Sequence, residues 1–307
     1  MTDESNTLYL KYRPQTFKEV VGQKEVLKSL VTMGKTKTIP HFLLFTGASG
    51  CGKTTIARIL KKMLKCGDSD FVEVNASSER GIDMARDLNR QAAMSPISGD
   101  CRVWLVDECQ AMTGDAQNAM LKILEDIPPK TYFLFATTDP HKLKKTIRTR
   151  ATELALKPIS EKDLVGLIET VAEKEDKEVS DDLAILIAQK SESSARKALV
   201  LLHTVINMTD EEAVEHLNSR DMEGEAIAIC RALGKKSTTW KQMAEILKSV
   251  KEEPEGLRWL IMSYATTTLL NTGNARAAAI IEEFRENWFD SKRSGLVISC
   301  YNIINGD

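Results

Sequence analysis

The sequence predicts an α/β domain built on a parallel sheet, then a small helical domain and an all-helical C-terminal domain. Short apolar runs alternate with amphipathic segments as far as about residue 158, and a glycine-rich turn follows the first run. Beyond that point the strand signals disappear. Alternation of this kind favours a parallel sheet with helices on both faces.

The elements follow from the spacing of apolar residues. The predicted strands are FLLF (42–45), FVEV (71–74), VWLV (103–106), YFLFA (132–136) and ELAL (153–156). Helical spacing between the first two strands comes from Ile56, Ile59, Leu60, Met63 and Leu64. Segment 115–126 repeats this spacing through Ala116, Met120, Ile123 and Leu124. Pro128 and Pro129 then end the helix.

The rest of the chain predicts helices at 161–175, 180–190 and 195–206, with several more after residue 210. Polar residues 210–212 mark a second boundary. We therefore expect three domains, with bounds 1–158, 159–210 and 211–307.

Composition sets limits on the class of protein. The 307 residues are 42% hydrophobic and 28% charged, and no apolar run approaches the ~18 to 20 residues that cross a bilayer. With no signal-peptide pattern, we expect a cytoplasmic protein and no membrane partner. Its six cysteines form no CxxC pair, so we expect neither a disulfide framework nor zinc.

Charge is distributed unevenly. Residues 1–160 carry 24 Lys and Arg against 18 Asp and Glu, whereas residues 161–307 carry 18 against 26. A basic first half allows a polyanionic partner, although charge alone does not separate DNA binding from a solvated surface.

The glycine-rich turn FTGASGCGKTT (45–55) fits the P-loop pattern. Its candidate nucleotide-binding residues are Gly47, Ala48, Ser49, Gly50, Cys51, Gly52, Lys53, Thr54 and Thr55. The turn lies between a predicted strand and a predicted helix, where backbone N–H groups and the helix N-terminus can face phosphates. Lys53 would then reach the β- and γ-phosphates, and Thr54 would ligate Mg²⁺. The alternative is a plain glycine-rich turn.

A pair of acids follows the third predicted strand. Ligands bind at the carboxyl ends of strands in α/β sheets, so Asp107 would hold Mg²⁺ through its water shell and Glu108 would polarise an attacking water. Cys109 and Gln110 are expected only to shape the neighbourhood. The alternative is that both acids merely solubilise a strand end.

Six segments together resemble the clamp-loader ATPases of the AAA+ superfamily. They are KYRPQTFKEVVGQ (11–23), GASGCGKTT (47–55), NASSERGID (75–83), VWLVDECQAM (103–112), NAMLKILEDIPP (118–129) and FATTDPHKLKKTIRTRA (135–151). Residues 107–150 are most similar to the bacterial DNA polymerase III gamma/tau subunit, and 75–83 to replication factor C small subunits. This mixture, with the small size, suggests a bacteriophage clamp loader, located in the host cytoplasm.

The resemblance implies an AAA+ domain, a helical lid and a C-terminal collar that joins subunits into a ring, taken as a pentamer of one or more subunit types. It implies ATP and Mg²⁺ as cofactors. It also implies a sliding clamp, primer–template DNA and other clamp-loader subunits as partners. The gamma subunit's four-cysteine zinc module has only Cys66 at its place here, so no zinc is implied.

The same resemblance gives roles to four further catalytic candidates. Arg150 fits the arginine finger that reaches a neighbour's nucleotide, although the segment reads RTRA where the family has Ser-Arg-Cys. Thr138 fits the sensor at the end of the fourth strand, and Arg196 the second sensor. Asn75 fits the polar switch that restrains Glu108 until DNA binds. Ordinary surface charge is the alternative for Arg150, and a turn role for Thr138.

Adenine and DNA contacts are also implied. The adenine candidates are Tyr12, Arg13, Pro14, Val20, Val21 and Pro158, for which core packing is the alternative. The DNA candidates are Arg80, Arg86 and Arg90, which would grip phosphates without reading bases. Ion pairs with Asp83 and Asp87 are the alternative for Arg86 and Arg90.

Helix-packing surfaces of the collar are expected at Trp240, Trp259, Tyr264 and Trp288, on apolar helical stretches. Three other functions share some of these motifs. A branch-migration helicase should carry a C-terminal winged helix, which 210–307 does not suggest. A non-hydrolysing clamp-loader scaffold should lack Lys53 or Glu108, and a P-loop kinase does not need Arg150.

Overall fold

The computed structural model describes residues 7–92, 94–235, 237–251 and 253–306. The chain divides into two compact units, Met1–Asn207 and Met208–Asp307. The three-domain division predicted from the sequence stays a prediction.

The first unit contains one five-stranded sheet in which every pairing is parallel, in the order β2-β3-β4-β1-β5. The strands are β1 (Phe42–Thr46), β2 (Phe71–Asn75), β3 (Arg102–Asp107), β4 (Thr131–Thr137) and β5 (Thr152–Ala155). All five predicted strands are confirmed within a residue or two. Residues at the carboxyl ends lie in register, Asn75 beside Asp107 and Thr46 beside Thr137. The side chains that follow these strands therefore gather at one edge of the sheet.

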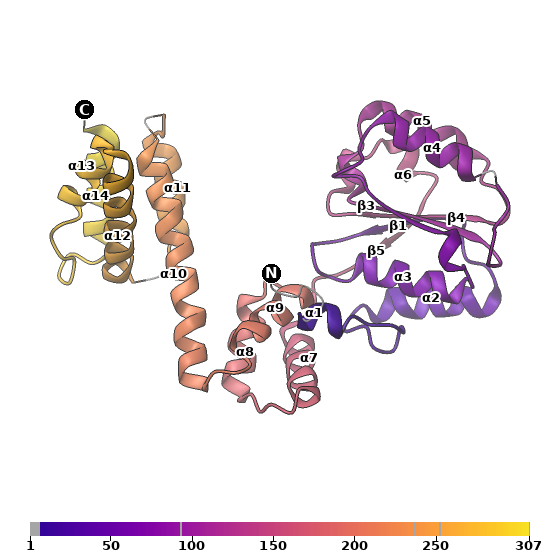
Figure 1. Ribbon diagram of the computed structural model, residues 1–307, viewed down its shortest axis with the longest axis horizontal. Helices are drawn as coiled ribbons and strands as arrows, with labels where there is room; N and C mark the ends of the chain where they lie inside the picture. Colours follow the sequence, from indigo (N-terminus) through magenta and orange to yellow (C-terminus); the bar gives the residue numbers. More distant parts are fainter. Residues whose placement is uncertain (1–6, 93, 236, 252, 307) are drawn as a thin grey trace. The chain divides into compact units, whose positions relative to one another are not determined.

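Helices cover both faces of the sheet, as predicted (Figure 1). They are α2 (Lys24–Thr36), α3 (Lys53–Met63), α4 (Ile82–Ala92), α5 (Gly114–Glu125) and the short α6 (Lys145–Arg148). Alternate residues of β1 serve opposite layers. Leu43 and Phe45 pack in the core with α2 and α3, whereas Phe42 and Leu44 pack in the core with α4 and α5. This two-sided burial explains why the strands read as continuous apolar runs.

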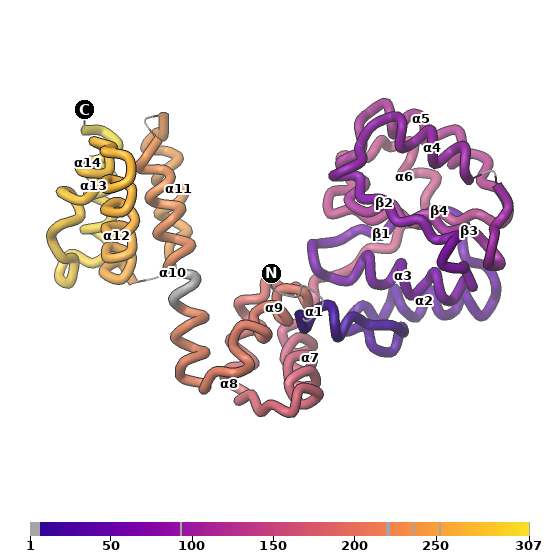
Figure 2. Tube along the Cα trace, viewed as in Figure 1, coloured from indigo at the N-terminus to yellow at the C-terminus, as the bar shows by residue number. Residues whose placement is uncertain are grey.

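Beside the short N-terminal helix α1 (Leu8–Lys11), the described residues of this unit form three further α-helices (Figure 2). They are α7 (Glu161–Lys174), α8 (Asp181–Lys190) and α9 (Ala195–Val205), each with a serine N-cap. Lys11 Nζ lies 2.6 Å from a Glu175 carboxylate oxygen, and Tyr12 OH donates to the Lys174 carbonyl at 3.3 Å. The α1 segment is thereby attached to the helical part.

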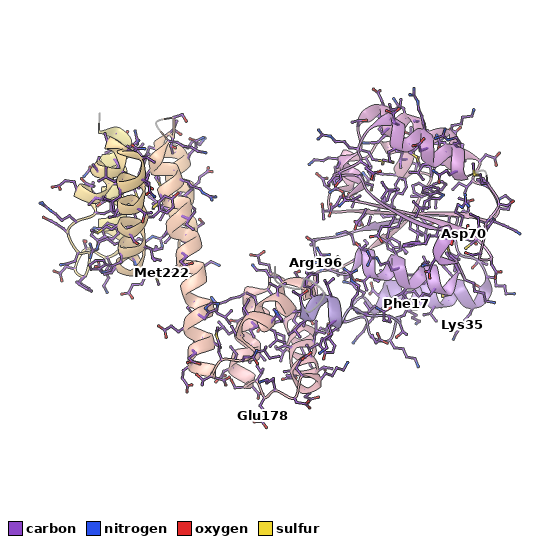
Figure 3. The ribbon with its side chains drawn as sticks, viewed as in Figure 1. Phe17, Lys35, Asp70, Glu178, Arg196 and Met222 are labelled. Atoms are coloured by element: carbon purple, nitrogen blue, oxygen red, sulfur yellow. The ribbon has the colours of Figure 1, made fainter. Side chains whose placement is uncertain are left out.

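Asp70, in the 3-10 helix η2 (Asp68–Asp70) and labelled in Figure 3, is a fully buried carboxylate that the sequence did not single out. It accepts the backbone N–H groups of Ile97, Ser98 and Gly99, and an Arg102 guanidinium nitrogen lies 3.2 Å away. Burial alone would raise the pKa of Asp70. The hydrogen bonds from Ser98, Ile97 and Arg102 outweigh it and lower the pKa from 3.8 to about 2.

Replacing Asp70 with asparagine is expected to lower the free energy of unfolding by about 3 kcal/mol, because the buried Arg102 charge loses its counter-ion. Urea denaturation measures this, with Asp68→Asn as the matched control on the exposed side of η2. Since the folded-state pKa is depressed, the stabilisation is full above pH 3.8 and is lost as the pH falls toward 2. Equal stability of the two variants would contradict the prediction.

The regular secondary structure among the described residues of the second unit is entirely helical. The helices are α10 (Asp210–Gly234), α11 (Trp240–Ser249), α12 (Pro254–Thr272), α13 (Ala275–Glu283) and α14 (Arg293–Asn305). Trp240 begins α11, whereas Trp259 and Tyr264 lie on α12 with exposures of 61% and 45%. The prediction that Trp288 lies on a helix is wrong. Trp288 follows α13, is buried, and donates its backbone N–H to the Glu255 carboxylate.

All six cysteines are free and buried. Burial raises the pKa of Cys230 to about 12, which keeps this thiol protonated.

Among the residues that the structure describes, no helix is both long and apolar enough to cross a lipid bilayer.

Candidate nucleotide-binding site

A cavity of about 820 Å³ lies in the first unit, at the carboxyl ends of the strands. This volume is in the range of small-molecule sites. Its lining includes the following candidates from the sequence: Tyr12, Arg13, Pro14, Val20, Val21, Ser49, Gly50, Cys51, Gly52, Lys53, Thr54, Thr55, Asn75, Asp107, Glu108 and Arg196. Residues far apart in the chain therefore meet at the cavity.

Two glycines shape the turn between β1 and α3. Gly50 and Gly52 have φ angles of 75° and 106°, which residues with a Cβ rarely adopt. A Cβ on Gly50 would lie 1.9 Å from Ser194 Oγ, so only glycine fits against the start of α9. Gly52 is the N-cap of α3 and supplies no side-chain cap. The first N–H groups of α3 are thus left for an anion in the cavity.

Lys53 is nearly buried, with 6% of its surface exposed. Its Nζ donates to the carbonyl oxygens of Gly47 and Ala48, at 2.7 and 2.8 Å. Those two residues do not line the cavity; their carbonyls hold the ammonium group beside it. When an anion is bound, the ammonium group can donate to phosphate oxygens in place of these two carbonyl oxygens, because both are hydrogen-bond acceptors.

Thr54 and Asp107 present two oxygen atoms side by side. The Thr54 hydroxyl donates to Asp107 Oδ2 at 2.7 Å, and the Glu108 N–H donates to Asp107 Oδ1 at 2.9 Å. A hydroxyl beside a carboxylate is a donor set that suits Mg²⁺, which prefers a few oxygen ligands and keeps several waters. The residues present therefore fit this ion.

Glu108 has a φ angle of 50° and turns its carboxylate toward Gln110. Gln110 Nε2 donates to Glu108 Oε2, and the Thr138 hydroxyl lies 3.5 Å from the same oxygen. Thr138 does not line the cavity but reaches Glu108 through this contact. Asn75 lines the cavity, and its Oδ1 accepts the Ser77 N–H at 2.9 Å. Gln110, expected only to shape the neighbourhood, thus contacts Glu108 directly.

Cationic side chains gather at the cavity. Burial, followed by the charges of Arg58 and Arg196, lowers the pKa of Arg13. Arg58 is offset by Glu73, to which it donates two hydrogen bonds of 2.9 and 2.7 Å. Arg196 comes from the first turn of α9 (Figure 3). Arg13 and Arg196 therefore favour an anionic ligand.

Sequence reasoning missed the α7 side of the cavity. Its lining residues there include Lys162, Asp163, Gly166, Thr170 and Lys174. They belong to an ordinary amphipathic helix, and no motif marks them. Pro158, expected at the adenine, does not line the cavity, whereas Ile159 beside it does.

Arg150 lies outside the cavity, after α6. Its guanidinium pairs with Glu125 and donates to the Thr146 carbonyl at 2.6 Å. A residue that acts on a neighbouring subunit is expected to lie outside the cavity of its own chain, as Arg150 does.

The DNA candidates are exposed on and near α4. Arg86 lies 3.3 Å from Asp83, and Arg90 pairs with Asp87, which are the ion pairs of the alternative interpretation. Their arginine side chains are 66% and 70% exposed, so these pairs contribute little stability and can exchange for phosphate.

Comparisons with known proteins show which family this chain is similar to. The family profile described as "DNA polymerase III, delta subunit" matches residues 68–160. The replication factor C small subunit of Methanococcus maripaludis is 36% identical in a match 217 residues long, which covers 68% of this chain and 69% of that protein. The chain belongs to the clamp-loader family of AAA+ ATPases.

Other clamp-loader relatives are longer. The DNA polymerase III subunit gamma/tau of Mycobacterium tuberculosis is 34% identical over 222 residues, and the match spans only 38% of its length. A solved structure of the Thermotoga maritima RuvB branch migration motor covers 86% of this clamp-loader chain and 94% of its own, with a TM-score of 0.58 and 22% identity. That likeness shows the AAA+ fold alone and confirms the predicted fold class.

Proposed function

We propose that this clamp-loader family member binds ATP with Mg²⁺, uses ATP binding and hydrolysis to open a sliding clamp and load it onto primer–template DNA, and is released by hydrolysis. The observation that carries the proposal is that Lys53, the Thr54–Asp107 pair and Glu108 line the same cavity. Relatives named as replication proteins support the replication role.

Each side chain has a task that fits its position. Thr54 and Asp107 would hold Mg²⁺, which would supply positive charge to offset that of the phosphates. Lys53 and the N-terminus of α3 would bind the phosphates. Glu108 accepts a proton from the attacking water.

Assembly and DNA complete the proposal. Arg150 reaches the γ-phosphate bound by an adjoining subunit, whereas Thr138 and Arg196 sense the γ-phosphate in the cavity of their own chain. Asn75 restrains Glu108 until DNA is bound. Arg80, Arg86 and Arg90 grip DNA phosphates, and the second unit acts as the collar of the ring. A bacteriophage source is also proposed, supported by the mixture of two family branches in one chain.

The branch-migration alternative is less well supported. A winged helix includes a β-hairpin wing, and the described residues of 208–306 contain no strand. Lys53 and Glu108 are both present at the cavity, which argues against a non-hydrolysing scaffold.

The test mixes the purified protein with primed DNA and candidate clamps and measures ATP hydrolysis. We expect turnover to rise when clamp and primed DNA are both present. Glu108→Gln should bind ATP without turning it over, which provides the matched control. An isolated chain that is fully active and indifferent to clamp and DNA would contradict the proposal.

A further inference from the structure

One amide group contacts both side chains that are proposed to meet the attacking water. Gln110, in the 3-10 helix η3 (Cys109–Ala111), donates from Nε2 to Glu108 Oε2 and, at 2.9 Å, to Thr138 Oγ1. An amide nitrogen carries two N–H groups, so it can donate to both partners at once.

The orientation of this amide follows from the buried hydroxyl of Thr137. The Asp139 N–H donates to Thr137 Oγ1 at 3.1 Å, which leaves the hydroxyl hydrogen for Gln110 Oε1, 2.7 Å away. With its oxygen accepting from Thr137, Gln110 must direct its nitrogen at Glu108 and Thr138. A flipped amide would instead place its oxygen against a carboxylate.

Glu108 needs such a partner because of where it lies. It is the residue between β3 and η3, in a left-handed conformation that is uncommon for a residue with a side chain. Neither a strand nor a long helix holds its carboxylate. Gln110, by contrast, is fixed to the end of β4 through Thr137, which is fully buried.

We infer that Gln110 is a positioning residue for hydrolysis: it holds the Glu108 carboxylate and the Thr138 hydroxyl at a fixed separation, so that both meet the same water. The kinetic part of this inference rests on the proposed function. The hydrogen bonds themselves do not, and they can be tested without nucleotide.

The first test uses NMR of the nucleotide-free, ¹⁵N-labelled full chain. The side-chain NH₂ resonances of Gln110 are assigned by their loss in Gln110→Leu. We expect them to shift in Glu108→Gln and in Thr138→Val, but not in Glu79→Gln, a matched change at an exposed carboxylate. If the Gln110 resonances shift neither in Glu108→Gln nor in Thr138→Val, the inference is overturned.

The second test separates nucleotide binding from turnover. In the active assembly, Gln110→Leu should lower kcat about 100-fold, the scale of a misplaced catalytic group, while the Kd for ATP stays within about twofold. Gln189→Leu, an exposed glutamine of α8, is the control.

Thermal denaturation of Gln110→Leu verifies that the variant is folded. Unchanged hydrolysis would overturn the inference, and so would raised hydrolysis, which would mean that Gln110 restrains Glu108. If the wild-type protein hydrolyses no ATP with any clamp and DNA, the proposed function fails, and the NMR result still decides whether Gln110 holds the two side chains.

Discussion

Replacing Lys53 with alanine is expected to lower the affinity for ATP about 100-fold or more. Lys53 is nearly buried, and its ammonium group is held at the cavity by the Gly47 and Ala48 carbonyls, where we propose that it binds the phosphates. Truncating one partner of a buried charge pair costs about 3 kcal/mol, which corresponds to that factor in Kd. Titration with a fluorescent ATP analogue measures the change.

The matched control is Lys61→Ala, which removes another lysine of α3 that pairs with Asp68 rather than with the P-loop. Its ATP affinity should equal that of the wild type. The Lys53 variant also leaves the Gly47 and Ala48 carbonyls without their donor, so circular dichroism should verify that the fold is intact. Unchanged affinity in a folded Lys53→Ala protein would remove the nucleotide-binding assignment.

The parts of the molecule that the sequence predicted well are those whose physics is local. The strand FLLF is a continuous apolar run because both faces of β1 are buried, and the turn after it needs glycine at positions 50 and 52. Lys53 and Thr54 follow from the same local pattern. Spacing along the chain was enough for these residues, since neighbours in sequence perform one task together.

Contacts that depend on strand order could not be predicted in this way. Gln110 meets Thr137 and Thr138 only because β3 pairs with β4, and nothing in the spacing of the motif shows that pairing. Asp70 likewise finds its partners in the segment before β3. Trp288 was misplaced because apolar residues indicate burial, whereas its position depends on a hydrogen bond to Glu255.

Replacing Arg150 with alanine is expected to leave ATP binding nearly intact and to lower turnover in the assembled complex by about 10³-fold, the scale of arginine-finger effects. Within one chain Arg150 pairs with Glu125 and the Thr146 carbonyl, so it contributes nothing to its own cavity. Reaching a neighbour's γ-phosphate requires exchange of Glu125 for a stronger anion. Turnover assays with clamp and primed DNA measure the loss, and Lys145→Ala, an exposed cation on the same short helix, is the matched control.

Action between subunits can be separated from action within one chain by mixing two variants. An Arg150→Ala subunit keeps an intact pocket, and a Glu108→Gln subunit keeps an intact finger, so each alone should be nearly inactive. In a mixed assembly the Glu108→Gln subunit would supply Arg150 to its neighbour's pocket, and part of the turnover should return. If Arg150 instead served its own chain, no mixture would regain activity, because every chain would lack either the arginine or the carboxylate. Recovered turnover would therefore link hydrolysis to assembly, as a ring-shaped loader requires.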